Sequence, residues 1–346
     1  MVFRYQKVRR VRRGDRVAVL SPSGFSASRF PAVAEKGIEA IRESFGLVPV
    51  TFPGTFAPPE EYYRDPLLRA RDLNEAYADD SISAIFATIG GDESIRVLPY
   101  LDAETIADHP KAFIGFSDNS TYHCFLSKIG IHSVHGSTLM AGFAQSSSFP
   151  REFLQYHEKV LFGDCSGLEL NAFPWYSEGY PDWSEGDPAR INDMKRSVPW
   201  RWLQGSYMSG RIFAGCIEVL DWVRGTPYWP GPEFWDGVLL FLETSEEVPS
   251  PLAVERFLRL YGIQGILGRI GGLAFGKFRG YSDAMREEVE GRILRVVTEE
   301  FGVDGLPVLS GVDFGHTDPR FPLPIGINAE IGDSKDSLRL LDSMTK

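Results

Sequence analysis

Cysteine is scarce in this 346-residue chain, which contains only Cys124, Cys165 and Cys216. The three are far apart, their number is odd, and no two of them form a Cys-x-x-Cys pair. This pattern argues against a disulfide framework and against a zinc site. We therefore expect a protein of the reducing cytoplasm that holds no metal.

Positive charge is also in short supply, because 36 Lys and Arg face 47 Asp and Glu, for a formal net charge of −11. An acidic surface repels phosphate backbones and anionic lipid, so neither a nucleic-acid polymer nor a membrane is an expected partner. The N-terminal stretch is rich in arginine, but Gly14 and Asp15 stand where the apolar core of a signal peptide would begin. Long apolar runs are missing too: residues 238–242 fall far short of the ~20 residues that cross a bilayer.

The length predicts about two globular domains, and 43% hydrophobic residues are enough to give each a packed core. Up to about residue 165, short apolar runs that end in Gly, Ser or Pro alternate with helical stretches, which is typical of a parallel α/β sheet. We expect strands at 16–20, 47–52, 82–89, 112–116 and 132–135. We expect helices at 31–45, 66–78, 93–101, 119–129 and 151–162. Ligands bind at the carboxyl ends of such strands, so the loops 21–24, 90–93 and 115–118 should share one rim.

The segment 166–205 is rich in aromatic residues and turn formers, with no clear secondary structure. Its rings either fill a seam between two domains or form a binding loop that stacks on a planar ligand. A second α/β region follows, with strands expected near 237–242, 273–275 and 307–314 and helices near 214–223, 251–261 and 283–301. The predicted domains are therefore 1–165, an N-terminal α/β domain; 166–205, an aromatic linker or substrate loop; and 206–346, a smaller C-terminal α/β domain.

Ser117 is the candidate nucleophile, because it stands directly after a predicted buried strand and before a predicted helix. A serine on such a turn projects from the rim of the sheet, and the amide of Asp118 at the helix N-terminus points the same way. The motif lacks the last glycine of Gly-x-Ser-x-Gly, and a serine before a helix is also an ordinary N-cap.

His316 is the candidate base, because it follows a strand predicted to end at Gly315 and precedes a proline-rich loop. The other histidines lie in turns, in helices or beside short strands, and His135 is the reserve candidate. Glu243 ends a buried apolar strand, where a carboxylate must find a partner or shift its pKa. The chain order Ser117, Glu243, His316 is that of serine hydrolases of the α/β-hydrolase type.

Five motifs occur in the chain in the order of a known family: 14–23 (GDRVAVLSPS), 89–94 (IGGDES), 115–119 (GFSDN), 241–244 (FLET) and 314–317 (FGHT). Together they resemble the LD-carboxypeptidase family of serine peptidases, peptidase family S66, over nearly the whole chain. The loop 90–94 and the tryptophan-rich stretch 200–203 are more similar to the microcin C immunity branch than to the murein-recycling branch.

The resemblance implies a fold and a set of site residues. It implies an N-terminal three-layer, doubly wound domain like that of class I glutamine amidotransferases, joined to a smaller C-terminal α/β domain, and a homodimer. Carried over residue by residue, it implies Ser117 as nucleophile, His316 as general base and Glu243 as the acid that orients it. The amides of Gly91 and Asp118 would form the oxyanion hole.

One motif departs from the family. Residues 214–217 read AGCI where relatives usually show Gly-Gly-Asn-Leu, so that Cys216 replaces an amide side chain near the expected pocket, with Glu218 just beyond. We take Glu218 as a candidate substrate-binding residue, together with Trp175, Trp183 and Trp202, whose rings could stack on a base.

The resemblance favours hydrolysis of aminoacyl or peptidyl nucleotides, such as processed microcin C, at the amide that joins amino acid to nucleotide. The alternative substrate is a murein tetrapeptide of cell-wall recycling. A non-catalytic binder of nucleotides or peptides stays open. A glutamine amidotransferase with a cysteine nucleophile is disfavoured, because Cys124 lies within a predicted helix and the other two cysteines are not on strand-to-helix turns. No cofactor is expected.

Overall fold

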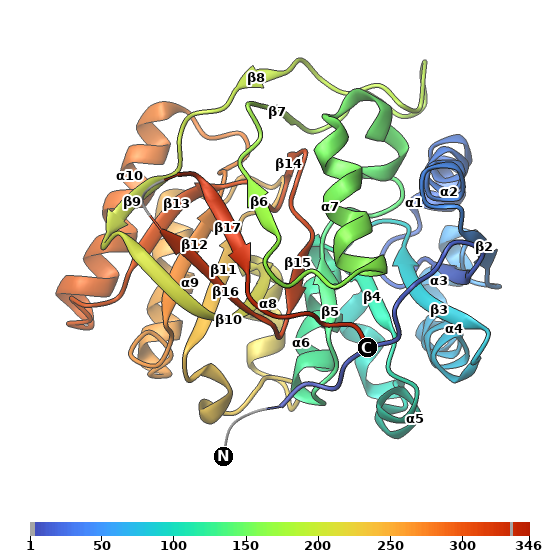
Figure 1. The fold of residues 1–346 in the computed structure, drawn as a ribbon, viewed down its shortest axis with the longest axis horizontal. Coiled ribbons are helices and arrows are strands. Elements are labelled where there is room, and N and C mark those ends of the chain that lie inside the picture. Colours follow the sequence, from blue (N-terminus) through green and yellow to red (C-terminus); the bar gives the residue numbers. More distant parts are fainter. Residues whose placement is uncertain (1–3, 333–334) are drawn as a thin grey trace.

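The computed structural model describes residues 4–332 and 335–346 of the chain. These residues form two large sheets and a small one. Figure 1 shows the first sheet and the helices of the N-terminal half on one side of the molecule, and the second sheet with helices α9 and α10 on the other. Among the described residues, no helix is both long enough and apolar enough to cross a membrane.

The first sheet has the strand order β15-β5-β4-β3-β1-β2. Its strands are β1 (Arg16–Leu20), β2 (Val48–Thr51), β3 (Ile82–Ala87), β4 (Ala112–Gly115), β5 (Ser133–His135) and β15 (Leu323–Ile325). All neighbours are parallel except β15, which runs antiparallel to β5. Because the strand order reverses direction between β1 and β3, a ligand site is expected beyond the carboxyl ends of these strands.

Helices separate the strands of the first half, and those over 31–45, 66–78, 120–128 and 151–162 match predicted helices, whereas three shorter ones were not predicted. They are α1 (Ser26–Arg29), α2 (Pro31–Phe45), α3 (Pro59–Arg64), α4 (Pro66–Ala78), α5 (Ala103–Asp108), α6 (Ser120–Lys128) and α7 (Arg151–Phe162). The helix expected at 93–101 is wrong, because two 3₁₀ turns, Ser94–Arg96 and Leu98–Tyr100, stand there instead. Pro99 has no N–H to donate and disfavours the helical conformation at the residue before it, so an α-helix cannot run through it.

The second sheet has the strand order β6-β17-β16-β10-β11-β12-β13-β9. Its strands are β6 (Glu169–Asn171), β9 (Arg201–Gln204), β10 (Tyr207–Cys216), β11 (Val238–Glu243), β12 (Gly272–Gly276), β13 (Val308–Val312), β16 (Asn328–Gly332) and β17 (Ser337–Leu340). The central four, β10 to β13, are parallel. Its helices are α8 (Ile217–Arg224), α9 (Pro251–Ile263) and α10 (Asp283–Arg295), which continues as a π-helical turn over Val296–Glu300.

The helix expected at 214–223 begins three residues too early. Residues 214–216 continue β10, where each pairs with a residue of β11 up to Cys216 opposite Glu243. The stretch from Ile212 to Cys216 is buried throughout, and a short buried apolar run has no periodicity that separates a strand from a helix.

Strands outside the expected pattern tie the two halves together. The aromatic segment contains β6 and β9, which form the two edges of the second sheet, and β7 (Trp175–Glu178) and β8 (Lys195–Arg196), which form the small sheet with β14 (Thr317–Asp318). Near the C-terminus, β15 returns to the first sheet. One buried apolar cluster accordingly spans both sheets, from Val19 and Phe86 to Phe241 and Phe314. The predicted domain boundaries stay a prediction.

Candidate active site

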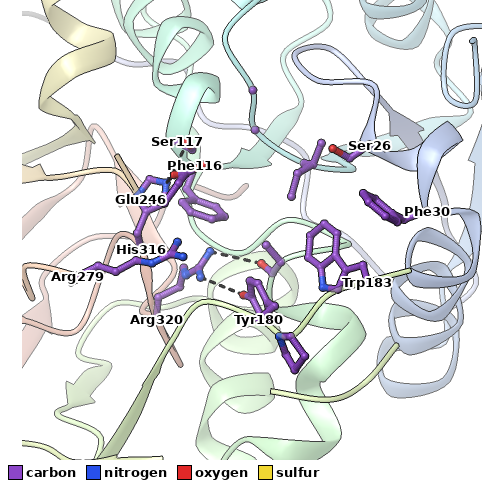
Figure 2. A pocket seen from close by; sticks show the side chains of 15 residues that line it. Ser26, Phe30, Phe116, Ser117, Tyr180, Trp183, Glu246, Arg279, His316 and Arg320 are labelled. Atoms are coloured by element: carbon purple, nitrogen blue, oxygen red, sulfur yellow. Dashed lines mark hydrogen bonds and ion pairs between the residues drawn. The ribbon is translucent and has the colours of Figure 1, made fainter. Parts of the chain in front are cut away.

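A cavity of about 400 Å³ opens where the carboxyl ends of β1, β3 and β4 meet loops of the second half. Figure 2 shows Ser117 and Phe116 near His316 and Glu246 at one end of it, and Trp183 with Phe30 at the other. The strand pattern placed a ligand site on this rim, and the cavity lies there.

Ser117 stands at a sharp turn between β4 and α6. Its φ of 61° is a left-handed conformation, which is uncommon and strained for a residue other than glycine. The turn brings Gly90 so close that a Cβ at that position would lie 2.7 Å from the Cβ of Ser117. The serine therefore sits on an elbow that projects its hydroxyl into the cavity, and a glycine opposite makes room for it.

His316 connects the serine to a buried carboxylate. Its Nε2 lies 3.1 Å from the Oγ of Ser117, and its Nδ1 lies 2.6 Å from Oε2 of Glu243. Glu243 is the last residue of β11, and His316 directly precedes β14. Gly315, which directly precedes His316, has a φ of 88° and packs so closely on Glu243 that a Cβ at position 315 would lie 2.6 Å from the Cβ of Glu243. The three predicted residues thus form one chain of hydrogen bonds.

The charges around His316 favour its protonated form. Burial lowers its pKa, but the adjacent carboxylates of Glu243 and Glu246 outweigh burial and raise the pKa to about 9. Burial also raises the pKa of Glu243, which the positive imidazolium partly offsets. Histidine and acid therefore form a coupled buried pair in which Nδ1–H donates to the carboxylate, as an orienting acid requires.

Glu246 is a site residue that the sequence analysis missed. Its Oε2 lies 2.9 Å from Nε2 of His316, while its side chain is 57% exposed. The stretch after Glu243 contains two adjacent glutamates, and nothing in that local pattern shows which of them turns toward the histidine.

The proposed oxyanion loops are tied together by the side chain of Asp118. This buried carboxylate accepts hydrogen bonds from the amide of Ser94 at 2.9 Å, from the hydroxyl of Ser94 at 2.7 Å, and from the hydroxyl of Ser23. Burial raises the pKa of Asp118, and these donors oppose the shift. Gly91 has a φ of 154°, and a Cβ there would meet Gly24 at 2.9 Å. The amides of Gly91 and Asp118 thus lie on loops that one carboxylate holds in place, and their role as an oxyanion hole stays a prediction.

His135, the reserve candidate, is a neighbour of the acid. It is fully buried, its Nε2 lies 3.9 Å from Oε1 of Glu243, and burial holds its pKa well below the usual range. A histidine kept neutral in this position packs behind the carboxylate, and it is His316 that lies within hydrogen-bond distance of Ser117.

The predicted substrate-binding residues lie in different places. Trp183 lines the cavity, with its ring 5.5 Å from that of Tyr180 and 5.7 Å from that of Phe30. Trp175 is on β7, is 48% exposed, and is not among the residues that line the cavity. Trp202 is on β9 opposite Leu309 and packs against the core.

Glu218 also lies outside the cavity lining. It is buried at the start of α8, where its carboxylate accepts hydrogen bonds from the amide and the hydroxyl of Ser245 and from the thiol of Cys216. These partners hold it beside the end of β10, away from the residues that line the cavity. Of the four predicted substrate-binding residues, the structure brings Trp183 alone to the cavity.

Two arginines that the sequence analysis did not single out line the cavity. Arg320 is buried and paired with Asp318 at 2.7 Å, and its guanidinium lies 3.7 Å from the ring centre of Phe116. Arg279 lies near Glu246, and Figure 2 shows its side chain directed toward the same end of the cavity. The sequence alone did not indicate that the loops that carry Arg279 and Arg320 both reach the cavity.

Comparison with known families decides what kind of protein this is. Residues 17–136 match the LD-carboxypeptidase N-terminal domain, and residues 209–331 match the LD-carboxypeptidase C-terminal domain. The chain belongs to the LD-carboxypeptidase family. It is therefore a peptidase-like hydrolase, and the predicted family, enzyme class and mixed α/β two-domain fold are confirmed.

Individual relatives of this chain have different described roles. The microcin C7 self-immunity protein MccF of Escherichia coli is 27% identical over 327 residues, which cover 91% of each chain. A probable murein peptide carboxypeptidase of Bacillus subtilis is 26% identical and covers 75% of this chain and 72% of its own. The structure of an MccF-like protein from Streptococcus pneumoniae in complex with AMP is 26% identical, with a TM-score of 0.84, and covers 94% of this chain and 98% of that one.

Proposed function

We propose that this protein hydrolyses aminoacyl or peptidyl nucleotides, such as processed microcin C, through a Ser117–His316–Glu243 triad. The observation that carries the proposal is the unbroken chain of hydrogen bonds from the serine hydroxyl to the buried carboxylate, at 3.1 and 2.6 Å, in the wall of a ligand-sized cavity. The strained φ of Ser117 supports it, since such strain collects at functional turns.

The proposed reaction begins with attack of the Ser117 oxygen on the amide carbonyl while Nε2 of His316 takes the hydroxyl proton. The oxyanion that forms accepts hydrogen bonds from the amides of Gly91 and Asp118. As the tetrahedral intermediate collapses, the carbon–nitrogen bond breaks and Nε2 returns the proton to the leaving nitrogen. A water molecule then attacks the acyl-enzyme with the same histidine as base, which releases the amino acid and restores the serine. No step requires a metal or a cofactor.

The nucleotide part of the proposed substrate is assigned to the aromatic end of the cavity. Trp183, Tyr180 and Phe30 gather there, and rigid rings stack well on a planar base. The relative from Streptococcus pneumoniae that was solved with AMP supports a nucleotide ligand, and so does the similarity to the microcin C7 self-immunity protein. Homodimer formation and a cytoplasmic location stay predictions.

Hydrolysis of a murein tetrapeptide is the second candidate function. The similarity to a probable murein peptide carboxypeptidase favours it, and the same triad would perform the chemistry. A small peptide has no planar base, however, so the ring cluster around Trp183 would have no partner in that substrate.

The test is a mass-spectrometric assay that offers the purified protein an aminoacyl sulfamoyl adenylate and a murein tetrapeptide side by side. Serine-dependent cleavage of the adenylate is expected, with loss of turnover on the order of 10⁶-fold in the Ser117→Ala variant. Cleavage of the tetrapeptide alone would move the function to wall recycling. Binding of either compound without turnover would make the protein a binder and would overturn the proposal.

A further inference from the structure

Glu246 is in an unusual position for a carboxylate beside a catalytic histidine. Its Oε2 is 2.9 Å from Nε2 of His316, the same nitrogen that lies 3.1 Å from the Oγ of Ser117. Glu243, in contrast, is buried and occupies the other ring nitrogen. Glu246 lines the cavity and is more than half exposed, so it can turn toward a ligand.

The two partners of Nε2 require opposite protonation states. Toward Glu246, Nε2 must carry a proton and donate it, whereas to take the proton of Ser117 in the reaction Nε2 must be unprotonated. A carboxylate that stays on Nε2 therefore keeps the base in its inactive form. The working enzyme needs something that draws Glu246 away from the histidine once substrate is bound.

We propose that Glu246 binds a free ammonium group on the acyl part of the substrate, next to the carbonyl that Ser117 attacks. In an aminoacyl group the α-nitrogen is bonded to the carbon adjacent to the carbonyl carbon. When that carbonyl lies within about 3–3.5 Å of the serine oxygen, the α-ammonium reaches the carboxylate that borders the same histidine nitrogen. The inference rests on the proposed function and deepens it, because it selects aminoacyl compounds over substrates whose α-nitrogen is acylated.

The charges around the end of the cavity that holds Glu246 fit a substrate that carries both a positive and a negative charge. Arg279 lines the cavity, and its positive charge helps to lower the pKa of the nearby Glu246 carboxyl. The other arginine, Arg320, is occupied by Asp318. An ammonium group would be repelled here without Glu246, while Arg279 can pair with the anionic linker between amino acid and nucleoside. An aminoacyl phosphate amide or sulfamate has these two charges on either side of the scissile bond.

Binding of the ammonium group also prepares the base. As Glu246 turns from Nε2 to the ligand, the imidazolium loses one of its two neighbouring carboxylates and releases the Nε2 proton to solvent. The neutral ring then accepts the hydrogen bond of Ser117 while Glu243 holds Nδ1–H. The groups around the ring are thus Ser117, Glu243, Glu246, the neutral His135 beside Glu243 and, at the same end of the cavity, the two arginines.

The experiment compares an alanyl sulfamoyl adenosine with its N-acetyl form, in the wild type and in the Glu246→Gln variant. Glu247→Gln is the matched control, because Glu247 is the adjacent exposed glutamate and does not line the cavity. The wild type and Glu247→Gln are expected to prefer the free amine in kcat/KM by about 10- to 100-fold, the range of one hydrogen bond between charged groups. In Glu246→Gln this ratio should fall toward one.

A binding measurement separates recognition from chemistry. Calorimetric titration of Ser117→Ala with the two compounds should show the same preference, and Ser117→Ala/Glu246→Gln should lose it. Turnover with an unchanged ratio in Glu246→Gln would overturn this inference and leave the proposed function standing. If the wild type cleaves neither adenosine compound, both proposals are overturned.

Discussion

Replacing Gly90 by alanine should misplace the nucleophile without removing any group that takes part in the reaction. The new Cβ would lie 2.7 Å from the Cβ and 3.0 Å from the Oγ of Ser117. Carbon atoms in contact normally stay ~3.5–4.0 Å apart, so the loop and the elbow must separate by about 1 Å. Neither side can yield by a simple rotation, because the Cβ of Ser117 is fixed by the strained turn itself.

The magnitude follows from that displacement. Overpacking of this kind destabilises a fold by about 1–3 kcal/mol, and a shift of ~1 Å in a catalytic group costs about 10²-fold in rate. We expect kcat/KM to fall by about that factor, and urea denaturation to show a modest loss in the free energy of unfolding. The activity should fall far more than the small fraction of unfolded protein could explain.

Gly291→Ala provides the control. This glycine lies in α10, and a Cβ there would meet no atom within 4 Å. The substitution should therefore raise the free energy of unfolding by about 0.4–1 kcal/mol and leave kcat/KM unchanged. Near-native activity in Gly90→Ala, with correct folding, would refute the argument that this loop packs directly against the nucleophile.

Four further predictions concern the proposed triad and the aromatic cluster. Glu243→Gln keeps the shape of the acid but should lower kcat by about 10⁴-fold, because an amide does not hold the imidazole in the required tautomer. Measured turnover rates check this, with circular dichroism to show that the variant is folded. A loss below tenfold would contradict an orienting role for Glu243. Since the pKa of His316 is raised to about 9 in the free protein, kcat/KM should increase with pH toward that value, and the acid limb of Glu246→Gln should lie at lower pH. Because the pKa of His316 is higher in the folded protein than its value of ~6.5 in the unfolded chain, protonated His316 stabilises the fold fully at a pH below ~6.5. This contribution is lost as the pH rises through about 9. The free energies of unfolding of the wild type and of His316→Gln should therefore converge between these two pH values. Trp183→Ala should raise KM for an aminoacyl adenylate by about tenfold, because stacking on a base contributes ~1–3 kcal/mol. KM for a peptide should not change. Equal effects on the two substrates would argue against stacking.

Several features were readable from the sequence because their causes are local. The strands β1, β3 and β4 are short apolar runs closed by turn residues, and helices such as α2 repeat apolar residues with helical spacing. The elbow at Ser117 was predicted because a strand, a Gly-x-Ser turn and a helix follow one another directly. His316 and Glu243 were found because each ends a buried run, where a polar side chain must have a reason to be.

Tertiary structure decided what those local patterns leave open. That Glu246 rather than Glu247 meets the histidine, and that Trp183 reaches the cavity while Trp175 and Trp202 do not, depends on how distant loops pack. Likewise, Cys216 continues β10 because it pairs with Glu243 of β11, and the local sequence alone does not distinguish a strand from a helix there. Sequence periodicity fixes which face of a strand or helix is buried, but contacts between segments far apart in the chain depend on sheet order and register. The three residues of the proposed triad could therefore be named from the sequence, whereas the residues that line the cavity around them were decided by the folded chain.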